Sequence, residues 1–128
     1  MQTKCFRLFS ENPQYKQIWP QFRAIPDSSL TNADQLRKHA TVYMCALKNI
    51  NNSILDENEL ALQMSLIAMA HIKWNVHRSH IMNMLHPVLD TVKEYNDGEM
   101  DANTEAAWTT FYDIIANVIE IFRDKQLE

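Results

Sequence analysis

The chain has 128 residues, of which 46% are hydrophobic and 22% are charged, and its formal net charge is −4. This length and this apolar content suit one globular domain spanning residues 1–128 and exclude an intrinsically disordered chain. The acidic balance argues against a nucleic-acid surface, and the presence of a single glycine argues against tight-turned sheets and glycine-rich phosphate loops, so we expect an all-α fold.

The cysteine content and the apolar runs bear on the cellular compartment. Two cysteines are too few for a disulfide scaffold. We find no segment with the features of a secretory signal, and no apolar run of membrane-spanning length. The sequence therefore predicts a cytoplasmic protein with reduced thiols and no membrane segment.

The N-terminal quarter predicts short helices separated by prolines. Cys5–Phe9 forms an apolar start that stops before Pro13. A short helical turn follows over Tyr15–Trp19 and is broken by Pro20. The stretch Pro26–Ser29 is typical of a turn or loop.

A long helix is predicted next. It should begin at Thr31 or Asn32, because either side chain can cap a helix, and it should end at Asn51–Ser53. Apolar residues recur at the i, i+3/i+4 spacing of one buried face. They are Leu36, Ala40, Tyr43, Leu47 and Ile50, with His39, Val42 and Ala46 beside them.

Three further helices complete the predicted stack. Asp56 and Glu59 resemble a capping box that opens a helix ending at Trp74–Val76. Its buried stripe comprises Leu60, Met64, Ile67 and His71. The next helix begins near Ser79, should kink at Pro87, and ends at Asn96–Gly98, with a stripe of Ile81, Leu85, Val88, Val92 and Tyr95. The last begins at Asn103 or Thr104 and carries Ala107, Phe111, Ile114, Val118 and Ile121.

His39 and His71 lie on the apolar stripes of two different predicted helices. A buried imidazole costs desolvation free energy unless its nitrogens have partners. Two imidazoles on facing helices could hold one haem iron from opposite sides, although their spacing alone also fits ordinary core histidines. We expect the other three histidines to be solvated, because a pair spaced for zinc without further ligands is a weak metal signal; they are His77, His80 and His86.

Four stretches, in order, resemble the globin family over nearly the whole chain, neuroglobin-like and nematode globins in particular. Cys5–Phe22 is similar to the part of a globin that runs from the second helix into the corner beside the haem. Leu36–Ala40 resembles the stretch around the distal histidine, and His71–Val76 resembles the proximal histidine with the following corner. Glu105–Tyr112 resembles the start of the terminal helix.

This resemblance implies haem b as cofactor, with His71 as the proximal iron ligand. It implies His39 as the distal residue, which either donates a hydrogen bond to a bound gas or ligates the iron itself. The other residues that it places around the haem are Cys5, Trp19, Phe22, Tyr43, Ile67, Val76, Ile81, Met84 and Ile115.

Three departures from the globin pattern stand out. Trp19 lies where globins usually have phenylalanine, and Tyr43 replaces a branched aliphatic residue with a hydroxyl that needs a partner when buried. Both changes disfavour ordinary oxygen storage and fit either an iron ligated by His39 or a sensor. The third departure is that Met1 aligns partway along the second globin helix, which predicts an N-terminally truncated stack of about six helices with an exposed apolar patch.

The implied function is reversible binding of dioxygen or another diatomic gas, without an enzymatic substrate. An alternative of another class is a cofactor-free helical interaction module derived from a globin. Haem-dependent redox chemistry, such as nitric oxide dioxygenation, would need a reductase partner, because the sequence has no flavin or nicotinamide motif of its own.

Overall fold

The computed structural model describes residues 2–30 and 32–128, with side chains described from Arg7 onward. Within these ranges every regular element is a helix, so the all-α prediction is confirmed. The elements are α1 (Gln2–Glu11), the 3₁₀ helix η1 (Pro13–Ile18), α2 (Pro20–Arg23), α3 (Asp27–Leu30), α4 (Asp34–Ser53), α5 (Glu57–Lys73), α6 (Arg78–Tyr95) and α7 (Ala102–Leu127). None of these helices is both long and apolar enough to cross a membrane.

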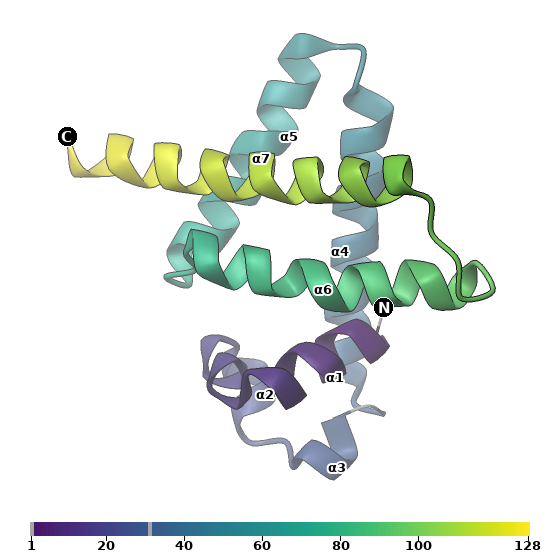
Figure 1. Ribbon diagram of the computed structural model, residues 1–128. Coiled ribbons are helices and arrows are strands. Elements are labelled where there is room, and N and C mark those ends of the chain that lie inside the picture. Colours follow the sequence, from purple (N-terminus) through teal and green to yellow (C-terminus); the bar gives the residue numbers. More distant parts are fainter. Residues whose placement is uncertain (1, 31) are drawn as a thin grey trace.

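The four long helices form two crossed pairs (Figure 1). In one pair α4 packs on α5, and in the other α6 packs on α7. The pairs are joined because α7 also packs on α5, while α1 packs on α6 and on α4. The short helix η1 packs on α1, and α2 packs on η1 and on α4.

The buried side chains fall into two clusters. The main cluster comprises Ile50, Ala68, Val76, Ile81, Val88, Tyr112, Ile115, Ala116 and Ile119. The N-terminal cluster comprises Leu8, Phe9, Phe22, Leu30 and Leu36. Met84 of α6 packs against both clusters, so this flexible side chain connects two parts of the interior that are otherwise separate.

Local signals explain where the long helices begin and end. The Asp56 carboxylate accepts a hydrogen bond from the Glu59 backbone N–H at 3.0 Å, which confirms the predicted cap of α5. The left-handed backbone of Asn75 (φ 56°) ends the α5 segment, as predicted. Pro87 is buried inside α6, which continues as α-helix on both sides of it.

Two predictions near the start of α4 were wrong. The stretch Pro26–Ser29, expected to be a loop, contains most of the one-turn helix α3, because Leu30 at its end is fully buried in the N-terminal cluster and holds the turn in place. Helix α4 begins at Asp34 with Ala33 at the N-cap and no side-chain cap bond, so Asn32 does not cap it. Thr31, the other expected cap, lies outside the described residues.

The predicted apolar stripe of α7 is only partly the face that this helix buries. Two of its residues, Phe111 and Val118, pack partly buried against the main cluster. Its other residues, Ala107, Ile114 and Ile121, are exposed, and the fully buried positions are Tyr112, Ile115, Ala116 and Ile119. Helix α7 contacts both α5 and α6, so it is apolar over a wide arc and its periodicity does not single out one face. Val42 and Tyr95, placed in or beside the predicted stripes of α4 and α6, are also exposed.

The N-cap of α7 gives a pH-dependent contribution to stability. Hydrogen bonds from the Thr104 backbone and side chain lower the pKa of Asp101 below its usual value. Because the folded-state pKa is lower than the unfolded one, the ionised cap stabilises the fold above the unfolded pKa, and this contribution is lost as pH falls through the folded pKa. We expect Asp101→Ala to lower the melting temperature at pH 7 and to leave it unchanged in strong acid.

Thermal unfolding at several pH values, followed by circular dichroism, checks this expectation. Asp124→Ala is the control, because it removes a carboxylate near the opposite end of the same helix. A deficit for Asp101→Ala that persists unchanged in strong acid would contradict the assignment of the cap to the ionised carboxylate.

Candidate functional site

His71 lies in the last turns of α5, on the face that packs toward the core. Its Nδ1 is 2.7 Å from the backbone carbonyl oxygen of Ile67. A carbonyl oxygen can only accept a hydrogen bond, so Nδ1 carries the proton and donates it. In the neutral ring this leaves the lone pair on Nε2, which is the atom that a metal would bind.

The surroundings of His71 keep its ring neutral. Burial lowers the pKa of His71 below its usual value, and the hydrogen bond to the Ile67 carbonyl opposes this only in part. A pKa below the usual 6.5 means that the imidazole is unprotonated at neutral pH. A histidine must be unprotonated to bind a metal, so His71 is held in the ligand-competent state.

His39 is half-buried on α4 between two aromatic rings. Its ring centroid lies 5.6 Å from that of Trp19 and 5.8 Å from that of Phe22, and both contacts are edge-on. Burial lowers the pKa of His39, and the charge that His71 would carry lowers it further. Both histidines that the sequence singled out therefore lie in partly buried positions, one on α4 and the other on α5.

The Tyr43 hydroxyl has a hydrogen-bond partner, as a partly buried hydroxyl requires. Its hydroxyl shares a hydrogen bond with the hydroxyl of Tyr112, which is buried on α7. Tyr43 follows His39 by one turn of α4, so this bond fastens the His39 segment to the terminal helix. Nothing in the sequence identified Tyr112 as that partner, because the two residues are distant in the chain.

The other predicted site residues divide between the two clusters. On the His39 side, Phe22 is fully buried in the N-terminal cluster and Trp19 packs partly buried against it. On the His71 side, the buried residues of the main cluster include Val76, Ile81 and Ile115, and Ile67 and Met84 pack partly buried against it. The Cys5 side chain lies outside the described part of the chain.

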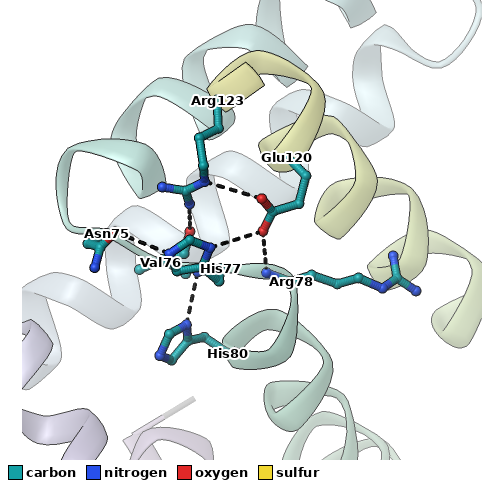
Figure 2. Close-up of polar contacts among 7 residues, drawn as sticks. All are labelled: Asn75, Val76, His77, Arg78, His80, Glu120 and Arg123. Atoms are coloured by element: carbon teal, nitrogen blue, oxygen red, sulfur yellow. Dashed lines mark hydrogen bonds and ion pairs between the residues drawn. The ribbon is translucent and has the colours of Figure 1, made fainter. Parts of the chain in front are cut away.

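A polar network at the corner between α5 and α6 was not foreseen (Figure 2). The Arg123 guanidinium on α7 donates to the Val76 carbonyl and, at 3.2 Å, to the Glu120 carboxylate. Glu120 also accepts from the Arg78 backbone N–H at 2.8 Å. Since the Val76 N–H donates to the His71 carbonyl at 3.1 Å, this network ties the end of the His71 helix to α7.

Two histidines of this corner differ from the prediction that they are simply solvated. His77 lies 3.4 Å from the Glu120 carboxylate, and its backbone N–H donates to Nδ1 of His80 at 2.9 Å (Figure 2). Burial and the neighbouring His77 lower the pKa of His80. His86 is exposed, as expected. The only signal in the sequence was the Glu120 and Arg123 pair, spaced to meet on one helix face.

The donor set at the two histidines is compatible with haem. It consists of two unprotonated imidazoles on α4 and α5, between two apolar clusters. Over the described residues, no three His, Cys, Asp or Glu side chains are grouped as a metal site. Two imidazoles suit an iron whose other ligands come from an apolar macrocycle.

Comparisons with known proteins agree with this arrangement. The Globin family model matches residues 5–119. Cytoglobin-1 of Oryzias latipes is 29% identical over 111 residues, which is 85% of this chain and 63% of the relative. Myoglobin of Heterodontus portusjacksoni is 43% identical over 44 residues, or 34% of this chain and 30% of the relative. The chain thus spans less than two thirds of the length of either relative.

Solved structures of similar fold include two of the myoglobin of Aplysia limacina. The ferric protein superimposes with a TM-score of 0.80 at 17% identity, and a double mutant with a TM-score of 0.80 at 18% identity. Each alignment covers 94% of this chain and 81% of the other. At this identity the likeness shows the fold alone.

Proposed function

This chain belongs to the globin family, and on that premise we propose that it holds haem b between α4 and α5 and reversibly binds dioxygen or another diatomic gas. The observation that carries the proposal is the partly buried imidazole of His71, whose Nδ1–H donates to the Ile67 carbonyl and leaves the Nε2 lone pair for a metal, with a second partly buried imidazole at His39. The haem would supply the ferrous iron to which the gas binds.

His71 is the proposed proximal ligand. The hydrogen bond that Nδ1–H donates to the Ile67 carbonyl leaves the Nε2 lone pair to bind the iron of a haem. Such a bond fixes the tautomer and the ring orientation, and it raises the basicity of the ligating nitrogen. The Arg123 side chain donates to the Val76 carbonyl and holds the corner that follows His71. The His71 ring is therefore held by Ile67 before it in the chain and by this corner after it.

His39 is the proposed distal residue, in one of two roles. As an unprotonated imidazole it can donate an N–H to a bound gas, or it can ligate the iron and compete with the gas. In the second role the apparent gas affinity falls in proportion to the fraction of open sites. The edges of Trp19 and Phe22 restrict the ring, which supports a fixed position rather than a freely rotating side chain.

The remaining proposed contacts are apolar and exclude water from the iron. Val76, Ile81 and Ile115 are buried in the main cluster. Because Met84 packs against both clusters, we further propose that residues 1–128 act as one domain. The exposed free thiol of Cys45 supports a reducing, cytoplasmic environment.

The visible spectrum of the haem-loaded, reduced protein distinguishes the two roles of His39. We expect the wild type to give a low-spin, six-coordinate spectrum and His39→Ala to give a high-spin, five-coordinate one, because the crowding of His39 by two rings favours ligation. His86→Ala, which changes an exposed histidine of α6, is the matched control. A high-spin spectrum in both wild type and His39→Ala would leave His39 as a hydrogen-bond donor and reject internal ligation.

A further inference from the structure

Helix α5 carries a second apolar stripe on the face away from the core. Its inner face packs against the main cluster through Leu60, Met64, Ile67, Ala68 and Ile72. On the opposite side Leu62, Leu66 and Met69 are 50%, 55% and 48% exposed. A helix that covers a core on one side normally has polar residues on the other. The outer face of α5 therefore has the composition of a buried surface, and none of the described residues covers it.

The apolar stripe ends in opposite charges. Glu59 lies one heptad before Leu66 and Lys73 lies one heptad after it, so both share the face of the stripe. Both are exposed, and neither forms an ion pair among the described residues. Glu59 accepts only a hydrogen bond from the Gln63 amide at 2.7 Å, and the Lys73 ammonium lies 5.5 Å from the Trp74 ring centroid.

A shallow hollow adjoins the basic end of this stripe. It has a volume of about 640 Å³ and is lined by Met69, Ala70, Ile72, Lys73, Trp74 and Gln126. The Gln126 amide at the end of α7 donates to the Met69 sulfur at 3.1 Å, which fixes one wall. Ala70 follows Leu66 by one turn, just as Leu62 precedes it by one turn. One turn before Leu66 the stripe therefore has the large side chain of Leu62, and one turn after Leu66 it has the hollow at Ala70.

We propose that the outer face of α5 binds a second copy of this chain, with the two α5 helices antiparallel about a two-fold axis at Leu66. A two-fold interface must be complementary to itself. In this arrangement Leu62 of each copy enters the hollow over Ala70 of the other, and Glu59 of each copy faces Lys73 of the other. Because one end of the stripe is acidic and the other is basic, an antiparallel second copy pairs both ends with opposite charges, which a partner of uniform charge cannot do.

Charge reversal tests this pairing. Glu59→Lys and Lys73→Glu each place like charges at two symmetric contacts, and we expect each to weaken dimerisation about tenfold. The double variant Glu59→Lys/Lys73→Glu restores both opposite-charge contacts and should recover wild-type dimerisation. Sedimentation velocity over a concentration series measures the monomer–dimer equilibrium of the full chain, and circular dichroism confirms that each variant is folded.

Substitutions in the apolar stripe provide a second, independent test. Leu66→Lys should abolish the dimer, while Val42→Lys on the outer side of α4, where Val42 is 66% exposed, should leave it intact. In a background with Cys5 and Cys45 replaced by serine, Leu66→Cys should form a reducible cross-linked dimer on mild oxidation, because the axis places this residue beside its own copy. Val42→Cys should form no cross-link and should run as a monomer on a denaturing gel without reducing agent.

Three outcomes would overturn the proposal. They are a wild-type chain that stays monomeric throughout the concentration series, a dimer that Leu66→Lys does not disturb, and a failure of the double charge reversal to restore association. These measurements follow association and not gas binding, so their results are separate from those that test gas binding.

Discussion

Replacing His71 with alanine is expected to lower haem affinity by at least about 100-fold. Loss of a residue that merely supports a metal ligand typically costs 10- to 100-fold in affinity, and loss of the ligand itself should cost at least as much. His71 supplies the unprotonated Nε2 that the Ile67 carbonyl orients, and no other histidine lies on the core-facing side of α5. Apolar burial of the macrocycle would remain, so binding should weaken rather than vanish.

Titration of the purified chain with haemin, followed by the Soret band, measures this effect. His86→Ala is the control, because it removes an exposed histidine of α6 and should leave haem affinity unchanged. Circular dichroism should show both variants folded, since His71 is only partly buried. Unchanged haem affinity in a folded His71→Ala variant would contradict the assignment of the proximal ligand, and absence of haem binding by the wild type would favour a cofactor-free helical module.

Replacing Phe22 with alanine is expected to lower the free energy of unfolding by about 3–5 kcal/mol, the largest effect on stability that we foresee. Phe22 is 0% exposed and is the largest of the fully buried side chains in the N-terminal cluster. Its ring lies 6.0 Å from those of Phe9 and Trp19 and 5.8 Å from that of His39. Truncation would remove apolar burial and leave a cavity among rings that cannot all move to fill it.

Urea unfolding followed by circular dichroism gives this free energy. Tyr95→Ala provides the comparison, because Tyr95 is 85% exposed and its truncation should change stability by no more than about 0.5 kcal/mol. Phe22→Ala should also disturb the haem spectrum through its contact with His39. A loss below about 1 kcal/mol would show that the N-terminal cluster contributes little to the stability of the fold.

Much of the fold could be predicted because its signals are local. The shortage of glycine and the i, i+3/i+4 spacing of apolar residues depend only on neighbours along the chain, and they predicted the four long helices. The Asp56 cap was predicted for the same reason. The stripe of α7 was predicted only in part, because this helix packs on two others and a wide apolar arc has no unique inner face.

Only part of the candidate site was predicted from the sequence. His39 and His71 were singled out from their stripes and from the resemblance to globins, and both are partly buried in the structure. Tyr112, Glu120 and Arg123 were missed, since each acts on a residue far away in the chain. A hydrogen bond between residues that are distant in the chain produces no periodic pattern in the sequence.

Local signals in the sequence were enough to predict a helical chain, the positions of its long helices and two inward-facing histidines. These properties follow from backbone propensity and from the burial pattern of single helices. Three further properties emerge only from the packing of the helices: the contact of Tyr112 with Tyr43, the bond from α7 to the corner after His71, and an apolar face of α5 that no described residue covers. Those properties depend on which helices cross and at which residues, and crossing is set by the packing of whole surfaces rather than by any local run of residues.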